Sequence, residues 1–329
     1  MPSTSDAFRT SVRHVTVAAG EAGTRLDRFV GLQLPGVPPA LVQRLCRQGQ
    51  VRVNGARARG ERRLALGDAV RLPPVTLTPP QEPGGVPAGA VALLRQRVLH
   101  VDDALMVLDK PPGMAVHGGS GQPWGVVDVL RQIHPDRPPE LCHRLDRDTS
   151  GCLLLAFDRA VLRQLATALA TRQMEKTYLA LVRGQPQPPR GVIRQALAKG
   201  RLQGGERMVH NDVAGREAVS RYEVAESLPG AALVRVALET GRTHQIRVHL
   251  ADRGHPLAGD DKYGDRAFNR ALRPLGLRRL FLHAAELSLI HPLSGAPLRV
   301  RADLPGDLTA VVARLRQNGV PGAGGDAHE

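Results

Sequence analysis

The segment "HRLDRDTSGCLLLAF", residues 143–157, joins a charged loop to an apolar run and predicts the centre of the fold. An apolar run without alternation is typical of a strand buried on both faces. Asp146 precedes this run with Arg144 and Arg147 close by, and nearby cations favour the ionised form of a carboxyl group. Asp146 is therefore a candidate nucleophile or base. It can equally neutralise its arginines or cap the following turn, and charge and spacing alone leave both roles open.

The same loop contains the residue types of a hydrolase triad in His143, Asp146 and Ser150. Three triad members within eight residues cannot usually meet in the required relay, and the sequence has no GxSxG nucleophile elbow. The loop therefore does not favour a serine hydrolase.

The chain is strongly basic, with 329 residues, a net charge of +14 and a pI near 11.0. Only four of its 45 basic residues are lysine, and arginine suits bidentate contacts to phosphate. A GC-rich genome would also raise the share of arginine, but would not by itself produce the net charge. The excess charge predicts an anionic partner, with nucleic acid as the leading candidate.

The cysteine count and the hydropathy pattern indicate where the protein works. Three cysteines form no CxxC pair and leave one over, which argues against a disulfide framework and a zinc site. No run reaches about 18 apolar residues, and the N-terminus lacks the apolar core of a signal peptide. We expect a cytoplasmic protein without membrane contact.

The composition changes along the chain and predicts two domains. A compact unit over 16–75 shows two helical stretches followed by short strands, with an Asn54-Gly55 hairpin signal. A Pro/Gly-rich linker is expected over 76–96 and a larger domain over 97–316. The ends, 1–15 and 317–329, are expected to be disordered tails.

The unit over 16–75 carries an excess of arginine. Between residues 41 and 75 there are eight arginines against two acids. We expect four of them to converge on one surface as a small RNA-binding module: Arg44, Arg47, Arg52 and Arg57. A solvated charged face is the alternative.

The larger domain mixes strand-like and helical stretches in irregular order. Strands are expected at "VLHV", "LMVLDK", "CLLLAF", "TYLALV", "SRYEVAE", "ALVRVALET", "AAELSLIHP" and "LRVRADLP". Helices are expected at "WGVVDVLRQI", "RAVLRQLATALATRQM", "HQIRVHLADRG" and "DLTAVVARLRQ". The order is not a repeating βαβ, so the predicted fold class is α+β, with a mixed, largely antiparallel sheet.

The segment "ETGRTHQIRVHLADRGHP" (239–256) supplies a possible partner for Asp146. Thr243 can cap a helix that begins there, and Arg247 then lies in its first turns, near a strand end. If the two segments meet, Arg247 can form a buried bidentate pair with Asp146. His244 and His249 diverge on such a helix, so we do not expect a metal site.

Two further segments contribute candidates. Tyr178 in "KTYLALV" is one of three tyrosines, and its ring can stack on a flipped base, although an ordinary strand tyrosine is the alternative. Lys110 ends a strand before the glycine-rich "PPGMAVHGGSG", which loosely resembles a phosphate-binding loop but can also be an ordinary surface loop. It lacks GxxxxGK[ST] and GxGxxG, so no nucleotide cofactor is expected.

Five ordered motifs are similar to those of one family: "LDKPPGMAVHGG", "HRLDRDTSG", "KTYLALV", "TGRTHQIRVHL" and "LFLHA". Over about 98–316 the chain resembles the RluA-type pseudouridine synthases, which modify ribosomal and transfer RNA. The unit over 16–75 resembles the alpha-L RNA-binding domain. With "GHPLAGDDKYGD", the arrangement is most similar to the C-type members, which act on uridines of large-subunit ribosomal RNA.

The resemblance implies a pseudouridine synthase domain that needs no cofactor and no metal, acting on 23S ribosomal RNA or a pre-ribosomal particle as a monomer. It implies that Asp146 is the catalytic carboxylate, Arg247 its partner, and Tyr178 the ring beside the target base that assists proton removal from C5. Arg144 would enter the RNA stack when the uridine flips out. The other RNA-binding candidates of this domain are Lys110, His117, Arg242 and His244, and Arg147 receives no role.

Two other functions stay open at this point. An RNA pyrimidine C5 methyltransferase would use Cys142 or Cys152 as nucleophile, but the glycine-rich "VHGGSG" lacks the following acidic strand end that a methyl-donor site needs. A non-catalytic RNA-binding or ribosome-assembly factor would keep the fold as a scaffold. The complete set of Asp146, Tyr178 and Arg247 argues against that scaffold.

Overall fold

The protein is described from a computed structural model that covers residues 8–34, 36–37, 39–77, 85–118, 123–203 and 206–321. The chain divides into two compact units, 1–85 and 86–329, and each is described by itself. Unit 1 is the smaller. Unit 2 contains the charged loop around Asp146.

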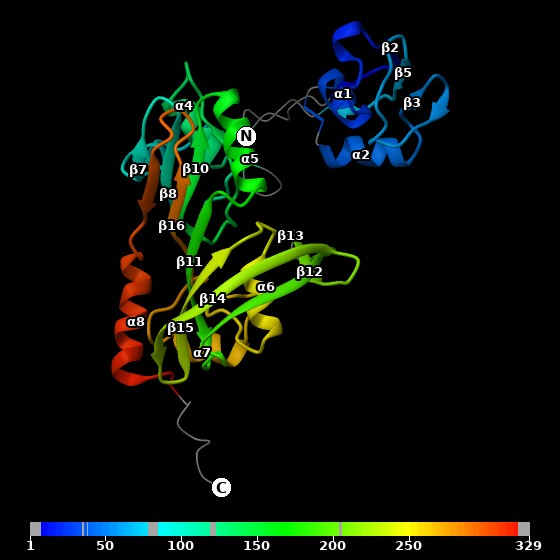
Figure 1. Ribbon diagram of the computed structural model, residues 1–329. Coiled ribbons are helices and arrows are strands. Elements are labelled where there is room, and N and C mark those ends of the chain that lie inside the picture. The colour runs from blue at the N-terminus through cyan, green and yellow to red at the C-terminus, as the bar shows by residue number, and fades with distance from the viewer. Residues whose placement is uncertain are drawn as a thin grey trace, which may run out of the picture. The chain divides into compact units, whose positions relative to one another are not determined.

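Unit 1 packs two helices against a small sheet (Figure 1). Its elements are β1 (Phe8–Arg9), β2 (Arg13–Thr16), the 3-10 helix η1 (Ala19–Glu21), α1 (Leu26–Gln33), α2 (Pro39–Arg47), β3 (Arg52–Val53), β4 (Ala56–Arg57), β5 (Ala69–Leu72) and β6 (Thr76–Leu77). The order in the four-stranded sheet is β2-β5-β3-β4, and β1 pairs with β6. Leu26, Phe29 and Val30 of α1 are fully buried against the sheet residues Val53 and Val70.

The expected hairpin is present in unit 1. Asn54 and Gly55 both have positive φ, 52° and 78°, as a type I′ turn requires. The turn pairs Arg52 with Arg57 across β3 and β4. The helix–helix–hairpin order predicted for 16–75 is therefore correct.

Unit 2 is built on one 11-stranded sheet. Its strands are β7 (Val98–Val101), β8 (Leu105–Lys110), β9 (Glu140–Leu141), β10 (Ser150–Ala156), β11 (Glu175–Arg183), β12 (Arg190–Gln203), β13 (Glu206–Asn211), β14 (Arg216–Leu228), β15 (Ala231–Leu238), β16 (Leu282–Ile290) and β17 (Pro297–Arg301). The main order is β13-β12-β14-β15-β11-β16-β10-β8-β7, with β17 beside β16 and β9 beside β10. Among the described strands, all pairs are antiparallel except β10 with β16. The α+β fold with a largely antiparallel sheet is thus confirmed.

Helices cover the sheet of unit 2. They are α3 (Ala88–Arg95), α4 (Val126–Ile133), α5 (Arg159–Ala170), α6 (Gln245–Asp252), α7 (Arg266–Leu272) and α8 (Gly306–Asn318). Strand β10 is buried on both faces: Leu153 and Leu155 pack with α3, α4 and α6, while Cys152 and Leu154 pack with α5. This accounts for the continuous apolar run that follows the charged loop.

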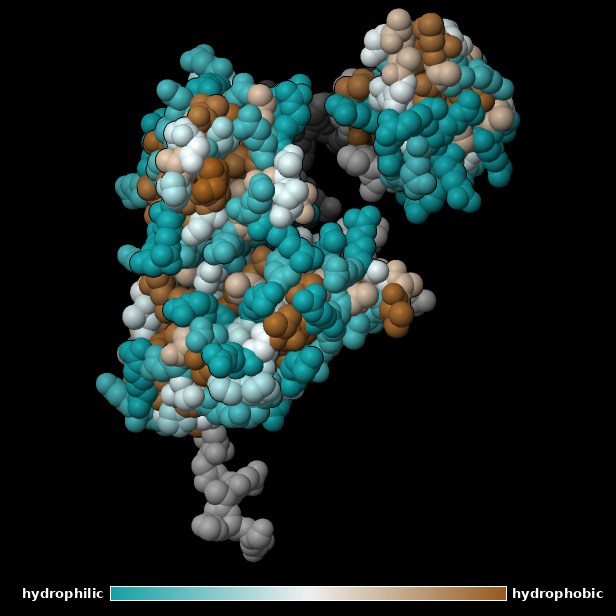
Figure 2. Space-filling model, in the orientation of Figure 1, coloured by the Kyte–Doolittle hydropathy of each residue, from teal (hydrophilic) through white to brown (hydrophobic). Residues whose placement is uncertain are grey.

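The hairpin of β12 and β13 extends away from the rest of the sheet (Figure 1). Neither these two strands nor α7 were predicted, because their polar and apolar residues follow no clear period. On the face drawn in Figure 2, hydrophilic side chains cover most of unit 2, and hydrophobic ones lie in separate patches.

The single parallel pairing among the described strands, β10 with β16, determines where the charged loop joins the sheet. Gly151, the second residue of β10, has a φ of 106° and pairs with Ala284 of β16. A Cβ on Gly151 would lie 2.2 Å from the Ala284 carbonyl oxygen, so no other residue fits here. The loop that carries Asp146 therefore leads into a strand that lies between β8 and β16, away from the edges of the sheet.

Three predicted boundaries need correction. Helix α3 lies inside the predicted linker 76–96, because Ala90 and Leu94 find a hydrophobic core to pack against. Strand β1 and the first three residues of β2 lie inside the predicted tail 1–15, since both strands find pairing partners, and α8 continues to Asn318. The rest of these predictions, 1–7, 78–84 and 322–329, lies outside the described residues. Within the described part of the chain, no helix has the length and apolar character needed to cross a membrane.

Candidate active site

Lys110 fixes the loop that carries Asp146 through hydrogen bonds to backbone carbonyl groups. The side chain of Lys110 is fully buried at the end of β8, and its ammonium donates to the carbonyl oxygens of Pro111, Met114 and Arg147, at 2.8, 2.8 and 2.9 Å. The Arg147 carbonyl also accepts from Gly113 N–H at 2.9 Å. All three donors of the ammonium are used, so Lys110 fixes the backbone one residue after Asp146.

The predicted RNA contact of Lys110 is therefore wrong. Its side chain has no exposed surface, and burial lowers its pKa to about 7. A strand-end lysine usually extends its ammonium into water, but here three carbonyl groups turn inward to receive it. Its role is to position the loop.

Asp146 faces a buried cation. Its Oδ2 lies 3.6 Å from Nη1 of Arg247 and 3.9 Å from Nε2 of His244. The Asp146 side chain is 21% exposed, whereas that of Arg247 is 8% exposed. The carboxylate thus lies at the boundary between solvent and a buried cation, where a bound substrate can reach it.

Arg247 is ion-paired with Asp146 as predicted, but through a single contact of 3.6 Å, so the predicted bidentate geometry is wrong. Arg247 forms a bidentate pair with Asp260: Nε donates to Oδ2 and Nη2 to Oδ1, both at 2.7 Å. The Asp260 side chain is completely buried, and Arg247 lowers its pKa against the effect of burial. Backbone N–H groups of Lys262 and Tyr263 also donate to Asp260 Oδ1. Arg247 is therefore locked, and its remaining nitrogen is presented to Asp146.

His244 occupies a strained position beside this pair. Its φ of 55° is left-handed, which is uncommon for a non-glycine residue, and it takes the N-cap position of α6 that Thr243 was expected to fill. Its Nδ1 lies 2.9 Å from the Tyr263 hydroxyl, which also accepts from Val209 N–H at 2.8 Å. The phenolic hydrogen is then free to donate to Nδ1, which leaves an N–H on Nε2 directed at Asp146. Burial lowers the pKa of His244, in agreement with a neutral ring.

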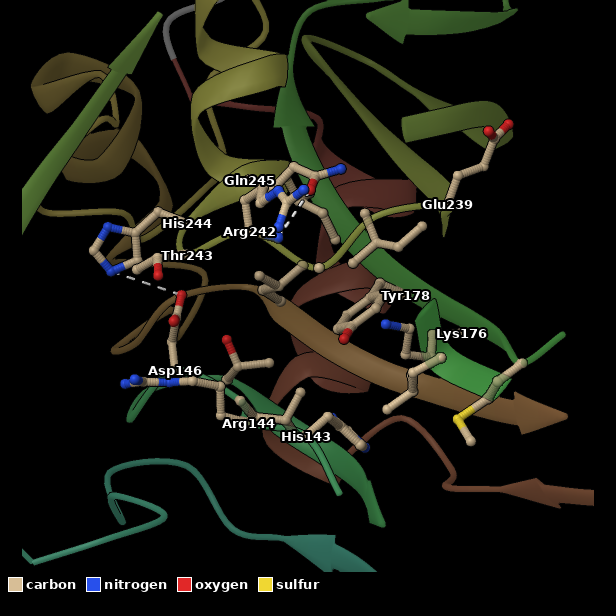
Figure 3. Close-up of a pocket in the computed structure, with 18 of the residues that line it drawn as sticks. His143, Arg144, Asp146, Lys176, Tyr178, Glu239, Arg242, Thr243, His244 and Gln245 are labelled. Carbon is tan, nitrogen blue, oxygen red and sulfur yellow. Dashed lines mark hydrogen bonds and ion pairs between the residues drawn. The ribbon is translucent and has the colours of Figure 1, made fainter. Parts of the chain in front are cut away.

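A cavity of about 410 Å³ opens in front of Asp146. Figure 3 shows Tyr178 and Lys176 across the cavity from Asp146, with His244, Thr243 and Arg242 on another wall. A cavity of this size falls within the range of small-molecule sites and fits a single base. The sheet and α6 thus bring the three predicted catalytic residues, Asp146, Tyr178 and Arg247, to one cavity.

The ring of Tyr178 is held in the core, and its hydroxyl is available. The residue is 6% exposed, and within the described residues no group hydrogen-bonds its hydroxyl. Burial raises the pKa of Tyr178, and the charge of Asp146 raises it further. Tyr178 is therefore a neutral phenol, suited to stacking and to hydrogen bonding.

The other RNA-binding candidates lie in different places. Arg144 and Arg242 are exposed and line the cavity, and His244 lines it from a buried position. His117 is exposed but is not part of the lining. The candidates of unit 1 are all exposed: Arg44, Arg47, Arg52 and Arg57.

Sequence reasoning missed Asp260, Tyr263 and Lys176 as site residues. The segment "GHPLAGDDKYGD" contains the first two, and a buried arginine near a carboxylate was a signal that a second carboxylate was needed. Lys176 lies two residues before Tyr178 on the same strand, so it shares the face that lines the cavity.

The structure argues against two of the alternatives. His143 Nε2 accepts from Leu154 N–H, and Ser150 Oγ bonds His283, so the hydrolase triad does not assemble. Burial raises the pKa of Cys142 and Cys152 to about 12, which disfavours the thiolate that a methyltransferase nucleophile needs.

Comparison with known proteins gives concordant matches. Residues 104–252 match the family model of RNA pseudouridylate synthases, and residues 24–70 match that of the S4 domain. The chain is 47% identical over 310 residues to the ribosomal large subunit pseudouridine synthase C of Escherichia coli strain K12, covering 93% of this chain and 97% of that one. It is 44% identical over 313 residues to the protein of the same name from Haemophilus influenzae, covering 94% and 97%.

Solved structures show the same similarity for the larger unit. The human protein titled RNA pseudouridylate synthase domain containing 4 is 32% identical, with a TM-score of 0.58, covering 69% of this chain and 95% of that one. Human RNA pseudouridylate synthase domain containing 1 is 25% identical, with a TM-score of 0.56, covering 72% of this chain and the whole of that one.

Proposed function

We propose that this chain isomerises specific uridines of large-subunit ribosomal RNA, with Asp146 as the catalytic carboxylate. The chain belongs to the RNA pseudouridylate synthase family and is an RNA pseudouridine synthase. One observation supports the role of Asp146 most strongly. Its carboxylate is at the mouth of a base-sized cavity, 3.6 Å from an arginine that a second carboxylate already holds in place.

The reaction breaks the bond between N1 and the ribose, turns the uracil, and joins C5 to the same ribose carbon. The C5 proton is lost and N1 gains a proton, so no atom is added and the oxidation state is unchanged. Asp146, with Arg247 beside it, is able to act as nucleophile or base on the bound nucleotide. Because Arg247 is fixed by Asp260, it stabilises the carboxylate without having to move during the reaction.

Tyr178 is proposed to support the base. Its ring forms one wall of the cavity, and its hydroxyl has no competing partner among the described residues. The raised pKa keeps the hydroxyl protonated, so it contributes stacking and a neutral hydrogen bond. Tyr178 is also proposed to assist removal of the proton from C5. Because its hydroxyl is protonated, it can accept the C5 proton only while it donates its own proton through its hydrogen bond.

The target uridine must leave the RNA stack to reach Asp146, which costs a few kcal/mol. Arg144 is exposed at the rim of the cavity and is proposed to fill the space that the uridine leaves. Arg242 and His244 line the same cavity and are proposed RNA contacts, and His117 is proposed as a more distant one.

Unit 1, which contains the S4 match, is proposed to anchor the RNA. Arg52 pairs with Arg57 on one side and with Arg71 on the other, so three guanidinium groups follow one another across the small sheet. Like charges directly opposite each other destabilise a sheet, and an RNA backbone would compensate them. Arg44 and Arg47 on α2 add to the basic surface.

The proposed partner is 23S ribosomal RNA, free or in a pre-ribosomal particle, and the protein is proposed to act as a cytoplasmic monomer. The test is incubation of the purified protein with unmodified large-subunit ribosomal RNA, followed by mapping of pseudouridines. We expect defined positions to be modified by the wild type and none by Asp146→Asn. RNA that is bound but never modified by the wild type would favour the non-catalytic RNA-binding factor.

A further inference from the structure

A second cavity lies beside the candidate active site and has no role in the mechanism above. Its volume is about 590 Å³. Its charged lining residues are Arg147, Asp148, Arg247, Asp260, Asp261, Lys262, Arg273, Arg278 and Arg279. Six of these are basic and three are acidic, so the lining carries a positive excess.

Two arginines of the lining are ion-paired within the protein. Arg247 is paired with Asp260. Arg279 is paired with Asp307, which is not part of the lining, and the two nitrogen–oxygen distances of this pair are 2.7 and 3.2 Å. Arg147 contacts its neighbour Asp148 at 3.2 Å, and both side chains are about half exposed, so this pair is weak.

Arg273 and Arg278 form the cationic wall of the second cavity. Both are exposed, and within the described residues neither is ion-paired with a carboxylate. Arg278 Nη1 donates to the Arg273 carbonyl oxygen at 3.0 Å, at the end of α7. This bond holds the Arg278 guanidinium close to Arg273, an arrangement that an external anion would stabilise.

The second cavity adjoins the first at Asp146. Asp146 lines the first cavity and Arg147 lines the second, although they are consecutive residues whose Cα atoms lie about 3.8 Å apart. Arg247 lines both cavities. The charges of Asp146, Arg147 and Asp148 all act on the pKa of Lys262, which burial lowers, so Lys262 is within electrostatic reach of the catalytic loop.

We propose that the second cavity binds a backbone phosphate of the RNA strand next to the flipped uridine, with Arg147, Arg273 and Arg278 as its ligands. The inference rests on the proposed function and extends it. A guanidinium group offers the planar fork that matches phosphate oxygens, and phosphate contacts fix the position of a nucleic acid without reading its sequence. Because Arg147 directly follows Asp146, a strand whose base reaches Asp146 brings a neighbouring phosphate towards Arg147. The phosphate contact then helps to offset the cost of flipping.

The first experiment compares Arg147→Gln/Arg273→Gln with the wild-type full chain in binding to unmodified large-subunit ribosomal RNA over a range of salt concentrations. Arg266→Gln is the matched control, because Arg266 begins the same helix α7, is exposed, and lies outside the lining. We expect the double variant to bind about tenfold more weakly, and its salt slope to fall by roughly 0.7 for each single-strand phosphate that it no longer neutralises. We expect KM to rise with Kd while kcat stays within about threefold, and the control to behave as wild type.

The second experiment removes the charge from the RNA instead of the protein. In a short RNA with the mapped uridine, the phosphates on either side are replaced one at a time by uncharged methylphosphonate. One replacement should weaken wild-type binding about tenfold and leave binding of the double variant unchanged, because that variant has no arginine pair to bind the phosphate.

The outcomes separate the phosphate site from the proposed function. Equal affinity and salt slope for wild type and double variant overturn the phosphate site, even if both form pseudouridine. Binding of inorganic phosphate to the wild type alone, with equal RNA affinities, also overturns it and indicates a site for a free anion. If the double variant binds RNA more weakly than the wild type as expected, but the wild type forms no pseudouridine, the phosphate site stands and the proposed function is overturned.

Discussion

Replacing Asp260 by asparagine should show how much the arrangement around Arg247 depends on one buried carboxylate. The pair has two contacts of 2.7 Å, and the side chains are 0% and 8% exposed. Asp260→Asn leaves a buried guanidinium without its counter-ion, a change that typically costs about 3–5 kcal/mol. It also places an amide N–H₂ among the donors of Arg247, Lys262 and Tyr263. We therefore expect the free energy of unfolding to fall by about that amount.

The same change should lower activity. Without Asp260, the Arg247 guanidinium is free to turn towards Asp146 and form a closer pair, which displaces the carboxylate from the cavity. A displacement of this kind can lower kcat by up to about 100-fold. Urea unfolding and steady-state kinetics on ribosomal RNA measure the two effects.

The pH dependence of the free energy of unfolding gives an independent check on the pair of Asp260 with Arg247. Arg247 lowers the pKa of Asp260 in the folded protein, so its contribution to stability is complete above the unfolded value of about 3.9 and is lost as pH falls through the lower folded value. The difference in stability between wild type and Asp260→Asn should therefore shrink below about pH 4.

Glu226→Gln is the matched control for Asp260→Asn. Glu226 forms a bidentate pair with Arg316 at 2.6 and 2.8 Å, but this pair is on the surface. Solvent screens such a pair, so the urea midpoint should not change measurably. If Asp260→Asn behaves like this control and keeps the wild-type kcat, the argument that Asp260 holds Arg247 is refuted.

Three further changes have expected outcomes. Tyr178→Phe should leave the free energy of unfolding within about 1 kcal/mol and lower kcat by about 100-fold, since its hydroxyl serves only the substrate; wild-type kcat in steady-state assays would remove the hydroxyl from the mechanism. Burial lowers the pKa of Lys110 from 10.5 to about 7, so the unfolded chain binds more protons between these values and wild-type stability should rise with pH there, relative to Lys110→Met, by at most about 1.4 kcal/mol per pH unit. A pH-independent difference in urea unfolding would contradict the burial of the ammonium. Arg52→Gln/Arg57→Gln should weaken RNA binding and reduce its salt slope, with Arg28→Gln on α1 as control, and an unchanged slope would show that unit 1 does not contact RNA through this row.

The sequence was sufficient for the main features of the fold because they rest on local signals. The apolar run after the charged loop predicted β10, and the Asn54-Gly55 pair predicted the hairpin of unit 1. The meeting of Asp146 with Arg247 was also anticipated. What periodicity cannot supply is the pairing of β10 with β16, which depends on the close approach at Gly151.

The errors have physical causes. Asp260 follows Arg247 by 13 residues in a loop, and only the folded chain shows that it is nearer than Asp146. The burial of Lys110 depends on carbonyl groups from two loops, which no sequence pattern predicts. Helix α3 was not predicted, because the prolines and glycines before it indicated a linker, although its residue Leu94 is fully buried. Arg147, which had no role from sequence, lines the second cavity, and its phosphate contact is proposed from that position.

The role of Asp146 is tested most directly by following the C5 hydrogen of the target uridine. Large-subunit ribosomal RNA labelled with tritium at C5 of uracil should release tritium to water when incubated with the wild type, because C5 gives up its hydrogen when it joins the ribose. Glu140→Gln is the control, because Glu140 is exposed, lies six residues before Asp146 and lines neither of the two cavities, so release should stay close to the wild-type rate. We predict that Asp146→Asn binds the RNA within about threefold of wild type and releases no tritium above background. Release by Asp146→Asn at the wild-type rate would contradict the assignment of Asp146 as the catalytic carboxylate.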